Sequence, residues 1–210
     1  ETGFFSIFMD RIFVGIMGNF TLVAITLFIL MGNLLTISGI ADRLFESLRF
    51  FAGTIRGGLG IAVLIVCIVL AACIGVVGAS VVTVGLLTGP MLLRYGYQKE
   101  LAMGIVAAGG TLGLMIPPSI MLIVMGDTAG LPVNHVLAAA VVPGLFMAVL
   151  YVVYVRVRCG LHPELGPPIP EEEMALTSFG DRLMDFVVYS LLPLMLIIGV
   201  IGAIFSGIAY

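Results

Sequence analysis

The sequence predicts an all-α integral membrane protein, and its composition, its long uncharged runs and its glycine- and proline-rich interruptions are the observations that predict it. The chain has 210 residues, of which 61% are hydrophobic, and a mean hydropathy of +1.25. Only 10% of its residues are charged, against about 25% in an average soluble domain. A soluble domain of this size cannot bury so much apolar surface. The net charge of −3 also argues against a nucleic-acid-binding protein, which needs a basic surface.

Charged residues divide the sequence into five long uncharged runs. These runs cover residues 12–41, 57–93, 101–126, 128–155 and 186–210. One helical span of a bilayer core about 30 Å thick needs roughly 20 apolar residues, so four of the runs fit one span each. Transmembrane β-strands would show as alternating segments of ~10 residues, which these runs do not contain. We therefore expect transmembrane helices.

The run over residues 57–93 is too long for one membrane span and too short for two spans of full length. If it enters the membrane and returns, eight of the nine basic residues fall on one side, and only Arg11 lies on the other. The positive-inside rule favours this arrangement, a helical hairpin with both ends cytoplasmic. We expect its turn at residues 75–80, between arms at 58–75 and 81–93 that are short enough for the tip to be re-entrant. The alternative is two short ordinary spans with a turn at the outer interface.

The next run contains a break of its own. Residues 107–119 include three glycines and the pair Pro117–Pro118. Proline lacks the backbone N–H of a helix and moves the preceding residue away from helical angles. We therefore expect a discontinuous helix with halves at residues 98–108 and 119–126. A simple proline kink is the alternative.

A re-entrant tip beside a broken helix is typical of the sites of secondary transporters, where half-helix N-termini attract anions and free carbonyls bind cations. Four hydroxyls lie at these two places, on Ser80, Thr83, Thr111 and Ser119. No Asp, Glu, Lys or Arg falls inside a predicted span, so a proton relay is not expected. Na⁺ bound by neutral oxygens is the predicted coupling ion, and no other cofactor is expected. For each hydroxyl alone, a bond to its own helix carbonyl is the alternative.

Four stretches of the sequence carry a family resemblance. They run from Phe28-Ile-Leu-Met-Gly32 to Ser38-Gly-Ile-Ala41, over Gly78-Ala-Ser-Val-Val-Thr83, over Tyr95-Gly-Tyr97, and over Ala107-Ala-Gly-Gly-Thr-Leu-Gly-Leu-Met-Ile-Pro-Pro-Ser119. These stretches resemble the large membrane subunit (DctM-like, or M subunit) of TRAP transporters, the tripartite ATP-independent periplasmic transporters of the ion-transporter superfamily. The resemblance implies the first of two inverted repeats of a Na⁺-coupled, elevator-type importer in the bacterial inner membrane. It also implies two protein partners, a periplasmic solute-binding protein and a small four-helix membrane subunit.

The resemblance further implies a sodium site between the hairpin tip and the unwound segment, and a substrate site at the tip. Carried over by position, the sodium candidates are Gly78, Ser80, Thr83, Gly110, Thr111 and Pro117, and the substrate candidates are Val77, Ala79, Ser80 and Ser119. The family's tip commonly reads Ser-Gly-Ser-Ser-x-Ala-Thr, whereas this chain has Val77-Gly-Ala-Ser-Val-Val-Thr83, so two hydroxyls are missing. We expect a small, carboxylate-bearing substrate with fewer hydrogen-bonding groups or with an apolar part.

Between the first span and the hairpin, residues 42–57 have the pattern of an amphipathic helix. Leu44, Leu48, Phe51 and Ile55 fall on one helical face, away from the charged side chains. We expect an arm helix in the inner membrane interface. A plain surface helix with no role in motion is the alternative.

These predictions divide the chain into seven segments. They are an outer-side segment and scaffold helix at 1–41, the arm helix at 42–57, the hairpin at 58–97, the discontinuous helix at 98–126, a transmembrane helix at 127–158, a cytoplasmic loop at 159–182, and the first helix of the second repeat at 183–210. An enzyme is not expected, because the motifs of intramembrane hydrolases are absent from the sequence. The alternatives to the importer are a Na⁺-coupled carrier of the same superfamily that works without a binding protein, and a channel or structural subunit.

Overall fold

The computed structural model describes residues 7–9, 12–13, 20–52, 55–75, 77–169 and 179–206, and every regular element of these ranges is a helix. In chain order the main elements are α2 (Phe20–Ile37), α3 (Ile40–Ala52), α4 (Gly58–Ile74), α5 (Val77–Arg94), α6 (Lys99–Thr111), the 3₁₀ turn η2 (Leu112–Leu114), α7 (Ile120–Ala129), α8 (Val133–Leu161), the 3₁₀ turn η3 (Pro163–Leu165) and α10 (Phe179–Phe205). The described part of the chain is thus all-α, which confirms the helical part of the predicted class.

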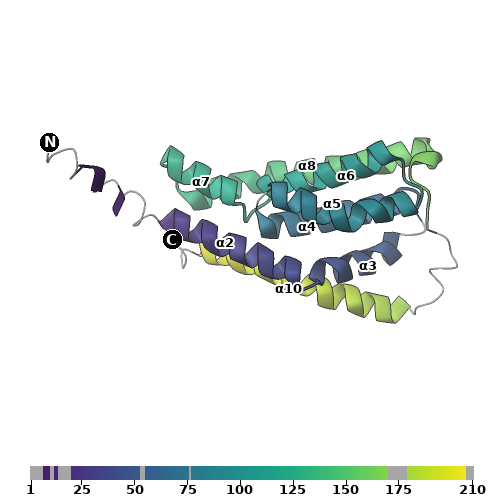
Figure 1. The fold of residues 1–210 in the computed structure, drawn as a ribbon, viewed down its shortest axis with the longest axis horizontal. Helices are drawn as coiled ribbons and strands as arrows, with labels where there is room; N and C mark the ends of the chain where they lie inside the picture. The colour runs from purple at the N-terminus through teal and green to yellow at the C-terminus, as the bar shows by residue number, and fades with distance from the viewer. Residues whose placement is uncertain are drawn as a thin grey trace.

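Helix α4 lies at the centre of the bundle. Its 17 residues are apolar on every face, and all but four of them are buried, which is the pattern of a helix surrounded by other helices. Helices α2, α3, α5, α6, α8 and α10 all contact it. Figure 1 shows α4 and α5 as an antiparallel pair whose closed end lies part-way along the molecule, while α2 and α7 extend past it.

The turn between α4 and α5 is tighter than predicted. Gly75 ends α4 with φ +67°, and its N–H donates to the Ala71 carbonyl at 2.9 Å. One glycine in the left-handed region reverses the chain, so α5 already begins at Val77. Gly78 and Ser80 therefore lie in the first turn of α5 and not in a loop, which corrects the predicted turn over residues 75–80.

The discontinuous helix breaks later than predicted. Helix α6 continues to Thr111, η2 follows, and α7 begins at Ile120. Gly109 and Gly110 are thus helical. The α-helix ends at Thr111 and the 3₁₀ turn at Leu114, and Pro117 and Pro118 then lack the N–H groups that would continue a helix.

Both ends of the hairpin lie at the same end of the molecule, together with the start of α6, the end of α8 and the start of α10 (Figure 1). Two backbone hydrogen bonds hold this end together. The Gly57 N–H donates to the Gly166 carbonyl at 3.0 Å, and the Gln98 N–H donates to the Leu165 carbonyl at 3.2 Å. The segment after α8 therefore closes the open end of the hairpin.

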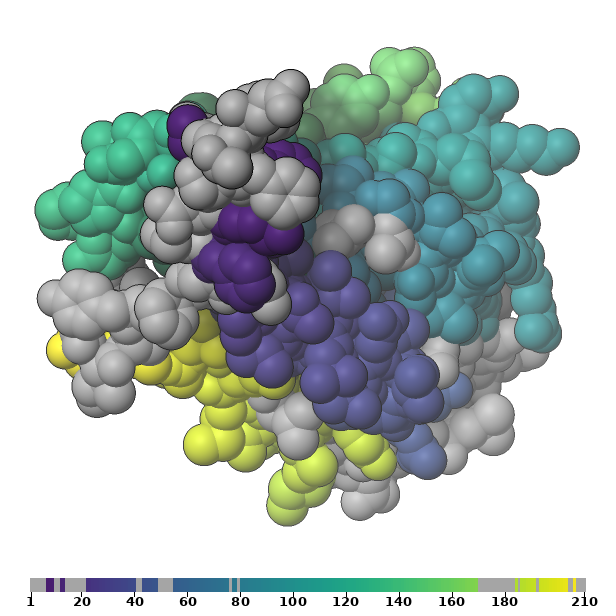
Figure 2. Space-filling model, turned by 60° about the vertical axis from the view of Figure 1, so that its left-hand side comes forward, coloured from purple at the N-terminus to yellow at the C-terminus, as the bar shows by residue number. Residues whose placement is uncertain are grey.

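Helix α3 buries its apolar face against protein. Leu44, Phe45 and Leu48 are buried where α3 meets α4 and α10, and in Figure 2 α2 and α3 (purple to blue) lie beside α10 (yellow). The predicted helix over residues 42–57 is too long at its end, because α3 stops at Ala52 and residues 55–57 form a bend and a turn. Ile55, expected on the apolar face, is 44% exposed.

Among the residues that the structure describes, two helices are long and apolar enough to cross a membrane, judged by length and composition alone. They are Val133–Leu161 and Phe186–Ala203. Shorter apolar helices cover Leu22–Ile37, Gly58–Ile74, Ser80–Arg94 and Ile120–Ala129.

Candidate functional site

The hairpin turn and the break between α6 and α7 are in direct contact. An added Cβ on Gly75 would lie 3.1 Å from the Ile120 side chain, so the turn touches the first residue of α7. An added Cβ on Gly113, in η2, would overlap the backbone carbonyl of Ala71 in the last full turn of α4. Two non-helical segments that are distant in sequence thus share one place in the fold.

Ser80 links the two segments through its side chain. The residue is fully buried, and its hydroxyl lies 3.0 Å from the Val77 carbonyl and 3.3 Å from the Gly110 carbonyl. The second contact connects the first turn of α5 to the last turn of α6. It is possible because Gly110 has no side chain, since an added Cβ there would overlap Val81.

The break itself leaves carbonyl oxygens without helical partners. In a continuous helix the Gly113 and Leu114 carbonyls would accept from residues 117 and 118, but both are prolines and have no N–H. The fully buried Ser119 hydroxyl replaces one of these donors, with a 2.9 Å bond to the Leu114 carbonyl. The hairpin covers this non-helical backbone, because Gly75 touches Ile120 and Ala71 touches Gly113.

The predicted site residues do not all gather at this contact. Ser80, Gly110, Pro117 and Ser119 are buried, Val77 and Thr83 are partly buried, Gly78 and Thr111 are exposed, and the side chain of Ala79 lies outside the described part. The Thr111 hydroxyl donates to the Ala108 carbonyl at 2.8 Å. A bond of this kind, to a carbonyl of the same helix, was the alternative to ion binding in the sequence analysis.

The contact supplies neutral oxygens, one hydroxyl and several carbonyls. Oxygen donors suit hard cations, whereas transition metals in proteins prefer nitrogen or sulfur. In the ranges that the structure covers, no group of three or more His, Cys, Asp or Glu side chains is placed to hold a metal ion. Cys67, Cys73 and Cys159 are buried and free. The donor set fits an alkali cation such as Na⁺.

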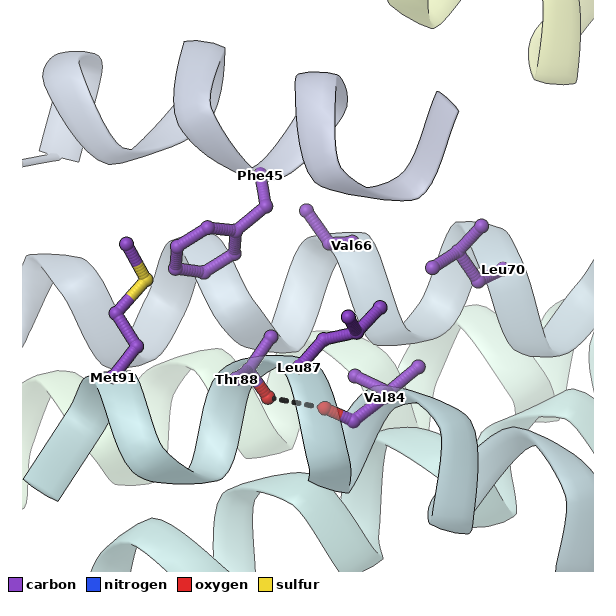
Figure 3. Close-up of a pocket in the computed structure, with 7 residues that line it drawn as sticks. All are labelled: Phe45, Val66, Leu70, Val84, Leu87, Thr88 and Met91. Atoms are coloured by element: carbon purple, nitrogen blue, oxygen red, sulfur yellow. Dashed lines mark hydrogen bonds between the residues drawn. The ribbon is translucent and has the colours of Figure 1, made fainter. Parts of the chain in front are cut away.

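A small cavity between α3, α4 and α5 is a weaker candidate for a ligand site. Its volume is about 140 Å³, and Figure 3 shows Phe45 from α3 facing Met91 and Leu87 across it. Its one side-chain hydroxyl, on Thr88, donates to the Val84 carbonyl at 2.8 Å. The cavity is therefore a mainly apolar packing gap, whose one side-chain hydroxyl already donates its proton within α5.

Comparison with known proteins decides the family. The family model described as "Tripartite ATP-independent periplasmic transporter, DctM component" matches residues 4–210. The chain belongs to this DctM family. The expected resemblance to the TRAP large subunit is thereby confirmed.

Individual relatives of this DctM chain carry transporter names. It is 30% identical over 191 residues to the C4-dicarboxylate TRAP transporter large permease protein DctM of Vibrio cholerae. The matched region covers 91% of this chain and 40% of the relative. It is 34% identical over 191 residues to the DctM protein of Pseudomonas aeruginosa (90% and 42%). It is 30% identical over 188 residues to the ectoine TRAP transporter large permease protein TeaC of Halomonas elongata (90% and 42%).

Two conclusions follow from these relatives. They are permeases and not enzymes, which agrees with the prediction, and they imply that the DctM chain is a multi-pass membrane protein. The chain spans less than half the length of each of these relatives.

Sequence reasoning missed the role of three glycines in this DctM chain. Added Cβ atoms on Gly109, Gly110 and Gly113 would overlap Cys67, Val81 and Ala71 respectively. The three glycines therefore let α6 and η2 approach the hairpin backbone closely, as small residues do between membrane helices. Their spacing of one and three residues was the available signal, but the sequence interpretation assigned them to the helix break.

Proposed function

We propose that this chain forms part of the large membrane subunit of a Na⁺-coupled TRAP importer in the bacterial inner membrane. The observation that carries the proposal is the buried contact between the Ser80 hydroxyl and the Gly110 carbonyl, which joins the hairpin tip to the helix break. Broken helices of this kind provide ion sites in secondary transporters. Membership of the DctM family supports the same function.

In this proposal Na⁺ binds between the tip and the break. The Ser80 hydroxyl and the Gly110 carbonyl, which lie 3.3 Å apart, are the ligands that the contact brings together. Gly78, Thr83, Pro117 and, through its backbone carbonyl, Thr111 complete the candidate set. A cation held by both segments favours the arrangement in which they touch. Ion binding is then coupled to the shape of the tip, where the substrate binds.

The hairpin is proposed to be re-entrant. Helices α4 and α5 have 17 and 18 residues, or about 26 Å each at ~1.5 Å per residue, which is short of a bilayer core of ~30 Å. The extension of α2 and α7 past the closed end supports a tip that stops inside the membrane (Figure 1). Two short complete spans are the competing arrangement.

The proposed substrate is a small solute that bears a carboxylate. Two of the relatives are named for C4-dicarboxylate transport and one for ectoine transport. The tip of this chain replaces family hydroxyls with Val77 and Ala79, and nearby Val82 is 60% exposed. Such a surface favours a solute with an apolar part over a polyhydroxylated acid.

The proposed partners are a periplasmic solute-binding protein and a small four-helix membrane subunit. In an elevator mechanism α3, which connects α2 to α4 in the chain, would be the arm between a static and a moving part. A carrier of the same superfamily that needs no binding protein is the alternative.

Uptake into proteoliposomes tests this function. The full-length protein, reconstituted with its small subunit and binding protein, is offered radiolabelled succinate and ectoine under Na⁺, K⁺ or proton gradients. Saturable uptake that requires the Na⁺ gradient and the binding protein is expected. Uptake that ignores the binding protein would favour the alternative carrier, and linear, gradient-independent flux would contradict a carrier of either kind.

A further inference from the structure

A second hollow of the molecule lies away from the hairpin tip, between α6 and α8. It is a groove of about 730 Å³, far larger than the cavity beneath α3. Its walls are mainly apolar and include Leu101, Ile105, Ala108 and Leu150. None of the residues assigned to the sodium or substrate sites lines it.

The charged residues that line the groove lie at one end only. Gln98, Glu100 and Arg158 line the end where α6 begins and α8 approaches its C-terminus. Ala108 and Leu150 line it eight or more residues further along the helices, about 12 Å deeper at ~1.5 Å per residue. The groove therefore runs from charged groups into a mainly apolar part that also includes Tyr151, which is the polarity of a phospholipid.

The charges at the polar end favour an anion. Within residues 94–100 and 156–164 the basic side chains are Arg94, Lys99, Arg156 and Arg158, and the acidic ones are Glu100 and Glu164. The two charged side chains that line the groove, Arg158 and Glu100, are of opposite sign, and the excess of two positive charges comes from the flanking residues outside it. Basic pockets between helices on the cytoplasmic side of a membrane protein attract anionic lipid headgroups.

The outer rim of the groove has the composition of a membrane interface. Tyr154, which lines the groove one turn before Arg158, is 60% exposed, and Leu150 is 43% exposed. Tyrosine is enriched at the headgroup level of membrane proteins, with apolar residues deeper in the bilayer. Water in an apolar groove of this kind has few polar partners, so a hydrocarbon chain is the better occupant.

We propose that this groove binds an anionic phospholipid, with one acyl chain along the apolar walls of α6 and α8 and its phosphate bound by the Arg158 guanidinium and the Gln98 amide. This binding site is independent of sodium and of the transported solute. It would hold α6 and α8 together at the cytoplasmic end of the protein.

Native mass spectrometry of the purified full-length protein tests the headgroup contact, after delipidation and addition of either phosphatidylglycerol or phosphatidylcholine. Arg158→Gln should lower phosphatidylglycerol retention about tenfold, as expected for the loss of one charge-assisted contact. Arg156→Gln, on the same helix but outside the groove, is the matched control and should lower retention much less, because it weakens the surrounding positive charge without removing a groove contact. Glu100→Gln should raise retention, because it removes the negative charge at the polar end.

A second pair of variants tests the acyl-chain part. An added Cβ on Gly104, which lines the groove, meets no atom within 4 Å, so Gly104→Leu fills the groove without a clash at the backbone. Gly202→Leu, on α10, has the same open surroundings and serves as its control. Loss of phosphatidylglycerol in Gly104→Leu but not in Gly202→Leu supports the proposal. Equal retention in both leucine variants, or equal loss in both arginine variants, would overturn it, because the lipid would then bind outside the groove.

Discussion

Gly113 shows how closely the helix break and the hairpin are packed. An added Cβ at this position would overlap the Ala71 carbonyl, which belongs to the rigid backbone of α4. A backbone carbonyl in a helix cannot relieve an overlap by changing its conformation, as a flexible side chain can by changing its rotamer. The glycine is therefore required by the approach of η2 to α4, and not only by the break.

Gly113→Ala is expected to destabilise the protein by about 1–3 kcal/mol, the usual cost of overpacking a close contact. Gly104→Ala is the matched control, because its added methyl group meets open space and alanine favours a helix over glycine by about 1 kcal/mol. Thermal unfolding of the purified protein in detergent measures both. An unchanged unfolding temperature for Gly113→Ala would show that η2 does not lie against α4.

The sequence could not assign every residue of this region correctly. A glycine that breaks a helix and a glycine that permits close packing look the same in sequence, so Gly109 and Gly110 were assigned to the break although they are helical. Ser80 and Thr111 are both hydroxyl residues beside the predicted kinks. Only the packing of α5 on α6 decides that the first is buried at the contact and the second is exposed.

At the scale of elements, the segment after α8 caps two helices at once. The Gly166 and Leu165 carbonyls accept from the N–H groups of Gly57 and Gln98, the residues that precede α4 and α6. The first N–H groups of a helix have no partner within it. The Tyr97 hydroxyl adds a third cap, because it accepts from the Gly60 N–H at 3.1 Å. No sequence pattern signalled this arrangement, since it depends on carbonyls of an irregular loop.

Tyr97 gives this cap a measurable pH dependence. Burial raises the pKa of the Tyr97 phenol to about 12, from 10.0. Because the unfolded chain loses its proton first, the folded protein should lose stability as pH rises from about 10 to about 12, by up to about 3 kcal/mol. Chemical unfolding at pH 8 and at several values above 10 measures this change.

Tyr97→Phe isolates the contribution of this hydroxyl. This substitution should remove the part of the stability loss at alkaline pH that comes from Tyr97. At pH 8 it should also cost about 1–3 kcal/mol, because the Gly60 N–H is left buried without its acceptor. Tyr154→Phe, at an exposed position, is the control. An alkaline loss that is identical in wild type and Tyr97→Phe would contradict the assignment.

The breaks themselves were largely predictable from the sequence, because glycine and proline act locally. A chain reversal near residue 75 and an interruption at Pro117–Pro118 follow from the conformations that these residues allow. The exact ends of α3, α5 and α6 were not predictable, since they depend on which tertiary contacts form. The same is true of the contact between tip and break, whose partners lie 30 residues apart.

At the scale of the whole molecule, the elevator proposal requires the hairpin to move relative to α2. Helices α2 and α4 meet at Gly32, where an added Cβ would lie only 2.8 Å from the Ile74 Cα, so that a cysteine there needs a small shift of the two backbones, and 3.4 Å from the Ile74 Cβ. This separation is close to the range that a disulfide bridges. A cross-link at this point would therefore join the proposed static and moving parts.

The double variant Gly32→Cys with Ile74→Cys, made after replacing every native cysteine of the full-length protein with alanine, Cys67, Cys73 and Cys159 among them, tests that motion. Oxidation should stop solute uptake in proteoliposomes, and a reductant should restore it. The two single-cysteine variants should be unaffected by the oxidant. Full uptake by the cross-linked protein would exclude movement of α4 past α2.

Sodium affinity tests the central claim most directly, namely that the hairpin tip and the helix break together hold the coupling ion. The sodium dependence of uptake is measured for Ser80→Ala, Thr111→Ala, the double variant, and the control Thr88→Val, whose buried hydroxyl bonds only within α5 in the described structure. We expect Ser80→Ala to raise the half-saturating sodium concentration about tenfold, for the loss of one oxygen ligand worth about 1.4 kcal/mol. Thr111→Ala should change the half-saturating sodium concentration little, alone or in the double variant, because the Thr111 hydroxyl is exposed and bonded to the Ala108 carbonyl. A sodium dependence that is the same in Ser80→Ala, the double variant and wild type would contradict the account and place the ion elsewhere.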